Sequence, residues 1–236
     1  MPDAALVLVG RGRYQDPWHD DAATAHAVIG ALAGTLDQRG VPVRVRGTSR
    51  DALGGAGPTD LALVVVCAGR GRADPDWDGD DTSWRPFHDT LAGLVAAGVP
   101  LLALHQAANT FADSPHWAQL LGGRWVVGTS RHPPIGPATF RVVDSGHPAT
   151  SGLTDVEAYD ERYCDLEVAP SSRVLAATEH EGRQHPVAWV SAGGPRVVYD
   201  GLGHDVRSYA SPSRRELLRR EVDWLLGGSA ASSTVG

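Results

Sequence analysis

The chain has 236 residues with a formal net charge of −7, and 42% of its residues are hydrophobic. This length and hydrophobic content suit one large α/β domain, and the negative charge argues against a surface that binds nucleic acid. All 21 basic residues are arginine. The absence of lysine excludes the Schiff-base chemistry of pyridoxal phosphate (PLP) enzymes and a lysine-bearing loop for nucleotide phosphates.

The cysteines and the apolar runs narrow the class of protein further. Cys67 and Cys164 are the only cysteines and form no C-x-x-C spacing, so neither a thiolate metal site nor a disulfide framework is expected. The first ten residues lack the basic region of a signal peptide, and no stretch approaches the length of a membrane span. We therefore expect a cytoplasmic protein with no membrane partner.

The first half of the chain alternates between predicted strands and predicted helices. Short apolar runs bounded by turn residues predict strands, and apolar residues at helical spacing, such as Ala25, Val28 and Leu32, predict helices. The strands are expected at residues 5–10, 41–46, 61–67 and 101–104, and the helices at residues 24–36 and 84–97. Residues 69–83, rich in Asp and Gly, predict a long loop that forms a flexible lid, forms a contact in a homo-oligomer, or is disordered.

The second half contains strands in quick succession. A helix is predicted at residues 109–121 and another at 214–226, with strands at 124–127, 138–143, 174–178, 187–190 and 196–199. The order of elements favours an α/β fold: a mainly parallel central sheet with helices on both faces, followed by an antiparallel extension. No linker divides the chain, so residues 1–228 are expected to form a single domain, and residues 229–236 a disordered tail.

The stretch from Pro100 to Phe111 organises the functional argument. The buried strand 101–104 stops at His105, and Ala103 and Ala107 stand two residues before and after it. Small neighbours at these positions are typical of a nucleophile elbow, a tight turn that raises one side chain above the sheet edge. If a helix begins here, its N-terminus keeps the imidazole neutral, and a neutral imidazole can act as a metal ligand or a general base. The alternative is a histidine that only hydrogen-bonds at a strand end.

Three histidines follow predicted strands at the same end of the sheet. These are His19, His105 and His204, and Gly201 and Gly203 give the last of them a tight backbone path. Sites in parallel sheets form outside the carboxyl ends of the strands, so we expect the three rings to converge on one pocket. Neutral imidazoles arranged in this way can hold a divalent ion such as zinc.

An acidic and aromatic segment offers a partner for these histidines. If residues 160–163 are extended, Glu161 and Tyr163 share one face, where a carboxylate and a phenol could hold sugar hydroxyls or complete a metal shell. The alternative is a solvated edge strand in which Asp160 pairs with Arg162. His132, in a His-Pro-Pro turn, is a further candidate for the pocket.

Eight short motifs, in their order and spacing, resemble the ThuA-like (trehalose utilisation) family. This family is related to proteins with the class I glutamine amidotransferase-like, flavodoxin-like fold. The resemblance covers about residues 5–227 and is carried by W-H-D-D, L-H-Q-A-A-N-T-F, W-A-Q-L-L-G-G-R-W, R-H-P-P, D-S-G-H-P-A-T-S-G-L, Y-D-E-R-Y, P-V-A-W-V and Y-D-G-L-G-H-D-V-R-S-Y.

The resemblance implies a fold and a class of ligand. In the amidotransferase relatives a cysteine occupies the elbow and a histidine follows a later strand; here His105 matches the cysteine position and His204 the histidine. The resemblance therefore implies that amidotransferase activity is missing, and that the ligand is a trehalose-type disaccharide or a keto-sugar derivative. The acidic stretch from Asp74 to Asp81 departs from the family pattern and leaves the substrate open.

We therefore expect an enzyme that acts on a carbohydrate at a histidine-rich pocket, where the histidines serve either as acid/base groups or as ligands of a divalent metal. Its expected catalytic residues are His105, His204 and Glu161; its substrate-binding residues are His19, Asp20, Asn109, His132, Tyr163 and Asp205; and its metal ligands are His19, His105 and His204. Two alternatives stay open: a non-catalytic carbohydrate-binding or regulatory domain, and a metal-dependent hydrolase of another small substrate.

Overall fold

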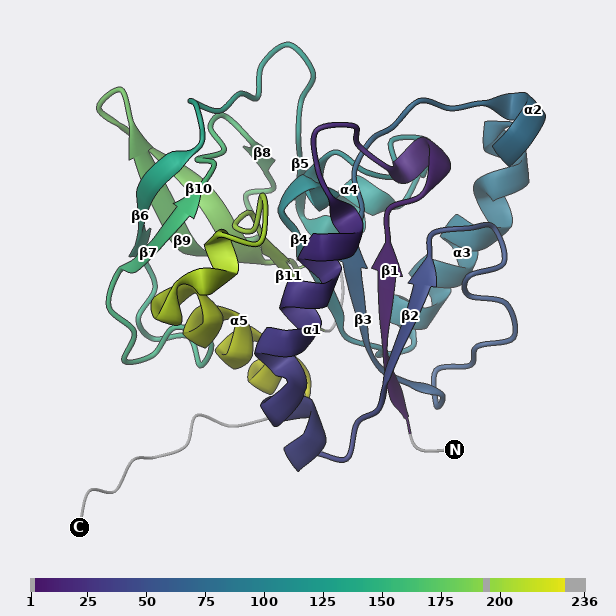
Figure 1. Ribbon diagram of the computed structural model, residues 1–236, viewed down its shortest axis with the longest axis horizontal. Coiled ribbons are helices and arrows are strands. Elements are labelled where there is room, and N and C mark those ends of the chain that lie inside the picture. Colours follow the sequence, from purple (N-terminus) through teal and green to yellow (C-terminus); the bar gives the residue numbers. More distant parts are fainter. Residues whose placement is uncertain (1–2, 193–195, 228–236) are drawn as a thin grey trace.

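A nine-stranded mixed sheet forms the centre of the computed structural model, which describes residues 3–192 and 196–227 (Figure 1). The strand order is β2-β1-β3-β4-β11-β10-β9-β6-β7. The first five strands in this order run parallel: β2 (Val43–Gly47), β1 (Ala4–Val9), β3 (Leu61–Cys67), β4 (Leu101–Leu104) and β11 (Val197–Asp200). The other four are antiparallel: β10 (Arg183–Val190), β9 (Arg173–His180), β6 (Gly136–Val142) and β7 (Val156–Asp160).

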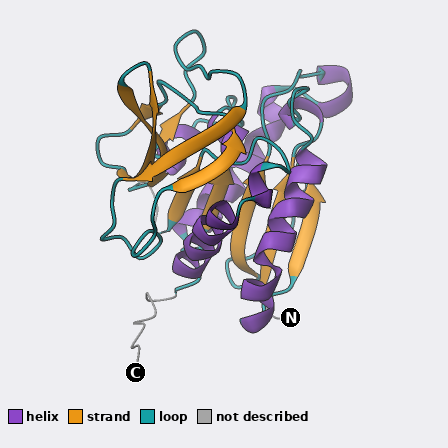
Figure 2. Cartoon of the chain, turned by 60° about the vertical axis from the view of Figure 1, so that its left-hand side comes forward, coloured by secondary structure: helices purple, strands orange, loops and turns teal. Residues whose placement is uncertain are grey.

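Helices cover both faces of the parallel strands (Figure 2). The helices are α1 (Asp21–Gln38), α2 (Pro75–Asp78), α3 (Asp81–Ala96), α4 (Trp117–Leu121) and α5 (Pro212–Leu225). Alternate residues of each strand point to opposite faces, so Val7 and Leu102 pack with α1 and α5, whereas Leu6 and Leu101 pack with α3. None of the helices in the described ranges is both long and apolar enough to cross a membrane. The fold is the expected α/β sheet with a parallel centre and an antiparallel extension.

The antiparallel extension has its own core. Phe140, Val156, Leu175 and Val187 belong to one buried cluster that is distinct from the two clusters flanking the parallel strands. Strands β9 and β10 are longer than predicted because they form a hairpin. Its two turn residues, Glu181 and Gly182, both have positive φ (51° and 71°), as a tight two-residue hairpin turn requires.

The helix predicted at residues 109–121 is wrong for most of its length. A four-residue 3-10 turn, His105–Ala108, follows β4, and α4 begins only at Trp117. Two features stop a continuous helix: Phe111 has a positive φ of 48°, and Pro115 disfavours helical backbone at the residue before it. The argument that a helix N-terminus keeps His105 neutral therefore loses its basis.

Two other expectations also need correction. The strand predicted at 124–127 is only Gly123–Arg124 (β5), which pairs with Glu167–Val168 (β8) in a separate two-stranded sheet. Residues 69–83 are not plainly disordered, because they contain α2 and the start of α3. The buried Arg13 ties this segment down by donating to Asp81 (2.8 Å) and to the carbonyl of Gly79 (2.6 Å). The expected tail at 229–236 lies outside the described residues.

Candidate functional site

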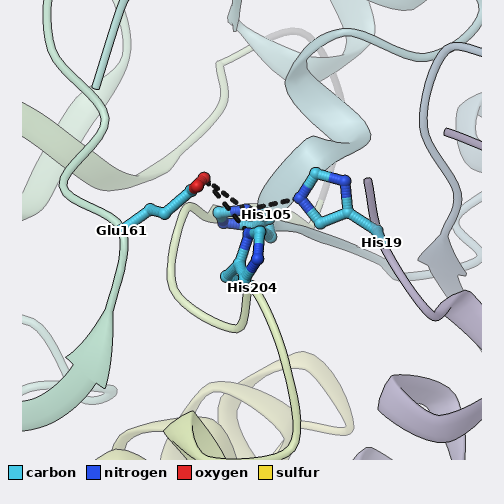
Figure 3. A group of neighbouring side chains, drawn as sticks. All are labelled: His19, His105, Glu161 and His204. Atoms are coloured by element: carbon cyan, nitrogen blue, oxygen red, sulfur yellow. Dashed lines mark hydrogen bonds and ion pairs between the residues drawn. The ribbon is translucent and has the colours of Figure 1, made fainter. Parts of the chain in front are cut away.

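Four side chains from distant parts of the chain meet at the carboxyl edge of the sheet (Figure 3). His19 lies in the loop between β1 and α1, His105 directly after β4, Glu161 directly after β7, and His204 in the loop after β11. One potential ligand atom from each lies within 4.8 Å of the others. The structure thus brings together the three histidines and the carboxylate that the sequence analysis placed in one pocket.

The backbone at His105 has the tight geometry expected of an elbow. Its φ is +45°, in the left-handed region, which is unusual for a residue other than glycine. Ala103 and Ala107 are fully buried on either side, and the hydroxyl of Tyr199 donates to the carbonyl of His105 (2.9 Å). These contacts hold the strained turn and direct the imidazole toward His19 and Glu161.

Hydrogen bonds, rather than a helix, fix the tautomer of His105. Its Nδ1 lies 2.8 Å from the carbonyl oxygen of Gly201, which can only accept, so Nδ1 carries the hydrogen. In the neutral ring Nε2 then has a lone pair, which faces the cluster and accepts from the hydroxyl of Tyr163 (2.9 Å). A backbone carbonyl behind one imidazole nitrogen is the usual support for a metal-binding histidine.

His19 is supported in a similar way by a carboxylate. Its Nδ1 lies 3.1 Å from an oxygen of Asp16, and its Nε2 lies 3.2 Å from Nε2 of His105. Burial lowers the pKa of His19, and the nearby rings of His105 and His204 lower it further, against the hydrogen bond to Asp16. His19 therefore presents a neutral Nε2 to the cluster.

Glu161 and His204 form the charged pair of the site. Nδ1 of His204 lies 3.2 Å from Oε2 of Glu161, which is also 3.5 Å from Nε2 of His105. Burial tends to raise the pKa of Glu161, but its close contacts with the imidazoles of His105 and His204 hold it well below its ordinary value. Burial likewise opposes a charge on His204, yet its close contact with the carboxylate of Glu161 raises its pKa. Glu161 is thus ionised, and its charge favours the protonated form of His204 when no cation is present.

Asp160 connects the two loops that carry this pair. Only 1% of the residue is exposed. Its carboxylate accepts from the backbone N–H groups of Gly203 (2.7 Å) and His204 (3.0 Å) and from the hydroxyl of Ser208 (2.6 Å). The alternative pairing with Arg162 is wrong, because Arg162 donates to the carbonyl of Glu179 (3.1 Å). Asp160 thereby fixes His204 against its neighbour Glu161.

A cavity of about 460 Å³ opens beside the four residues. Asn109, His132 and Tyr163 line it, as predicted, and Oε1 of Glu161 lies 3.3 Å from Nδ1 of His132. Trp18, whose residue surface is 82% exposed, and Trp125 add two indole faces to the cavity. The cavity therefore combines aromatic faces with polar and charged groups.

Two predicted substrate-binding residues lie outside this cavity lining. Asp20 is the N-cap of α1, where its side chain accepts from the N–H of Ala23 (2.9 Å), a local role that competes with ligand binding. Asp205 pairs instead with the exposed Arg207. Conversely, the sequence analysis missed Asp16, Trp18, Gln106 and Trp125, all of which line the cavity. The spacing of Asp16 and His19 in D-P-W-H is the signal that could have revealed the first of them.

A larger cavity, of about 690 Å³, lies between the loops after β1 and β2 and the helices α2 and α3. Arg11, Arg50 and Trp77 are among its lining residues, and it shares no lining residue with the histidine cavity. Size alone does not mark a site. We assign the functional site to the smaller cavity because titratable groups with shifted pKa values converge there.

The donor atoms of the cluster suit a divalent cation. With Nδ1 of His19 and of His105 each donating outward, their Nε2 lone pairs face each other at 3.2 Å. Such a contact between two acceptors is unfavourable unless a proton or a cation lies between them. Three imidazole nitrogens and one carboxylate are a ligand set typical of zinc and other first-row divalent metals.

Comparisons with known proteins agree with this architecture. Residues 7–225 match the family model ThuA, described as trehalose utilisation. A ThuA-like protein from Parabacteroides merdae has a TM-score of 0.77 at 16% identity, covering 98% of this chain and 92% of that one. A ThuA-like protein from Bacteroides uniformis has a TM-score of 0.69 at 16% identity, with coverages of 95% and 91%.

More distant neighbours share the same fold. A glutamine amidotransferase from Thermotoga maritima has a TM-score of 0.59 at 10% identity, and the match covers 97% of this chain and 100% of that one. At such identities the likeness shows the fold alone. A comparison with curated protein sequences finds no significant match. Because the family model spans nearly the whole chain, the protein belongs to the ThuA (trehalose utilisation) family.

Proposed function

We propose that this protein is an enzyme that acts on a carbohydrate, a trehalose-type disaccharide or a keto-sugar derivative, at the histidine cavity. The observation that carries the proposal is the convergence of His19, His105, His204 and Glu161 beside a cavity with indole walls. The family description, trehalose utilisation, supports a sugar as the ligand.

The cavity lining suits a sugar ring. Trp18 and Trp125 offer flat apolar faces that can pack against the C–H groups of a ring. Asn109, His132 and Tyr163 offer donors and acceptors for hydroxyl groups around it. A mostly apolar pocket with a few convergent polar groups is the usual form of a small-molecule site.

The roles of the four central residues follow from their protonation. His19, His105, His204 and Glu161 would hold a divalent cation such as zinc, which polarises a carbonyl or hydroxyl oxygen. Without a cation, the ionised Glu161 is placed to accept a proton and His204 to donate one. His105 and His204 are acid/base groups or ligands, and Glu161 is their carboxylate partner.

The elbow argues against amidotransferase chemistry. The position of a nucleophilic cysteine is held by His105, and neither Cys67 nor Cys164 belongs to the cavity lining. Burial raises the pKa of the Cys67 thiol to about 12, which makes it a poor nucleophile. The chain thus lacks the group that would attack glutamine.

The test combines metal analysis with turnover. The purified protein is analysed for bound metals and incubated with disaccharides, including trehalose, and with their 3-keto forms. We expect a divalent metal near one equivalent and conversion of one of these sugars. His105→Ala and His204→Ala should each reduce turnover at least a hundredfold while the protein stays folded, because each removes a group from the reacting centre.

The control variant is His26→Ala, which removes an exposed imidazole on α1, away from the cavity, and should retain full activity. A sugar that binds but is recovered unchanged would replace the enzyme proposal with a carbohydrate-binding domain. Turnover that survives both His105→Ala and His204→Ala would place the reaction elsewhere.

A further inference from the structure

The hydroxyl of Tyr163 and a bound cation need the same lone pair. Tyr163 is 5% exposed, and its ring stacks on His105 with centroids 4.3 Å apart. Its hydroxyl lies 2.9 Å from Nε2 of His105. In the neutral ring, Nδ1 of His105 donates to the carbonyl of Gly201, so Nε2 is the acceptor and the Tyr163 hydroxyl is the donor.

That nitrogen is also the one that faces the other ligand atoms. Nε2 of His105 lies 3.2 Å from Nε2 of His19 and 3.5 Å from Oε2 of Glu161. An imidazole nitrogen has a single lone pair in the ring plane. It can accept a hydrogen bond or coordinate a cation, but not both at full strength.

We propose that His105 holds the Tyr163 hydroxyl in the cation-free site and releases it into the cavity when a divalent cation binds. The released hydroxyl is then available to donate to an oxygen of the bound ligand, because Tyr163 lines the same cavity as Asn109 and Trp125. This inference rests on the cation site of the proposed function and adds an order of events: the cation comes first, and the ligand hydrogen bond second.

The exchange couples the two ligands thermodynamically. Cation binding breaks the hydrogen bond from Tyr163 and frees a donor; a ligand oxygen that takes this donor prevents its return to His105. Coupling between two sites is reciprocal, so the ligand must strengthen cation binding by the same factor. Tyr163 is thus a positioning residue toward the cation and a binding residue toward the ligand.

The test measures cation affinity without any sugar. Metal-free wild type and Tyr163→Phe are titrated with Zn²⁺ and with Co²⁺ at pH 7, and the Co²⁺ complex is followed by its visible absorption. Because the variant has no hydrogen bond to break, it should bind the cation about fivefold more tightly, the factor that matches a net hydrogen bond of about 1 kcal/mol.

The fold offers a matched control in Tyr199→Phe. Tyr199 is also buried and its hydroxyl also donates to His105, but to the backbone carbonyl rather than to the imidazole. This variant should gain no cation affinity. A second readout is the ¹⁵N chemical shift of His105 Nε2 in the metal-free protein, which should change in Tyr163→Phe because the nitrogen loses its donor.

The outcomes are distinct. Tighter cation binding in Tyr163→Phe alone supports the inference. If Tyr163→Phe binds the cation as tightly as wild type does, the inference is overturned. Weaker cation binding by Tyr163→Phe also overturns it, because Tyr163 would then be a ligand of the cation. Tighter cation binding in both Tyr163→Phe and Tyr199→Phe overturns it as well, because it points to a general loosening of the elbow. If wild type binds neither cation, the cation site of the proposed function fails together with this inference, whereas the sugar assay still tests the cavity.

Discussion

The parallel and antiparallel parts of the sheet contribute to the site by different routes. Parallel strands β1, β4 and β11 all end at the same edge, so the residues that follow them, His19, His105 and His204, must gather there. Glu161 comes from the end of β7, at the far edge of the antiparallel part. It is held at the same place because the carboxylate of its neighbour Asp160 accepts hydrogen bonds from the backbone N–H groups of Gly203 and His204. The order and direction of the strands therefore position the histidines, whereas specific hydrogen bonds position the carboxylate of Glu161.

The largest expected effect comes from cutting the connection between the two parts. Asp160→Ala leaves the buried N–H groups of Gly203 and His204 without their acceptor, and each unsatisfied donor costs about 1–3 kcal/mol. We expect a loss of about 3 kcal/mol in the free energy of unfolding, together with weaker binding of Zn²⁺. Urea unfolding and metal titration measure the two effects.

Asp155→Ala is the control for that variant. Asp155 precedes β7 and accepts one long bond, from Val142 (3.3 Å), at an exposed position. It should change stability by less than about 0.5 kcal/mol. If Asp160→Ala is as stable as this control, the carboxylate does not join the two parts and the comparison fails.

A smaller effect is expected from overfilling the elbow on the parallel side. Ala107→Leu adds three carbons at a fully buried site next to the positive φ of His105, and such overpacking costs about 1–3 kcal/mol. Thermal unfolding measures the loss, with Ala210→Leu, at an exposed position, as the control. A melting temperature equal to that of the parent would mean that the elbow does not need small neighbours.

The smallest effect concerns pH and the antiparallel side alone. Burial, together with the nearby Arg173, lowers the pKa of His147, whose Nδ1 accepts from the N–H of Ala149 (3.1 Å). Since the folded pKa lies below the unfolded value of about 6.5, the folded state binds fewer protons, and stability falls as pH drops below about 6.5. Urea midpoints at pH 7.5 and pH 5 should therefore differ less in His147→Asn than in wild type.

The His147→Asn variant keeps an acceptor near the N–H of Ala149, so its stability at pH 7.5 should stay close to that of wild type. An unchanged pH dependence would assign the acid sensitivity to other groups. In that case the pH dependence of stability would be assigned to the charged pair of Glu161 and His204, which lies where the two parts of the sheet meet.

The same contrast explains what could be predicted from sequence. Apolar runs and helical spacing identified the parallel strands and the helices α1, α3 and α5, since these elements are buried on a regular period. Because sites form outside the carboxyl ends of parallel strands, the three histidines could then be predicted to lie together at that edge. The helix at 109–121 was wrong because its apolar spacing is overridden locally, by Pro115 and by the positive φ of Phe111.

The groups that hold the site residues in place could not be predicted from such sequence patterns. The acceptor behind His105 is a backbone carbonyl, that of Gly201, which leaves no trace in the side-chain pattern. Asp16 and Trp18 lie in an irregular loop, where no period tells which side chains point into a cavity. Asp20 was predicted to bind the substrate but is the N-cap of α1, because an N-cap aspartate and a ligand-binding aspartate look alike in sequence.

The buried Arg13 has a consequence for the entropy of binding. It and its neighbour Tyr14 anchor the start of the loop that carries His19: Arg13 through Asp81 and the carbonyl of Gly79, and Tyr14 through Asp113 (2.8 Å). The N-cap of α1 anchors the other end of the loop. The entropic cost of ordering this loop is therefore met during folding, so it does not reduce the affinity for a ligand that contacts His19.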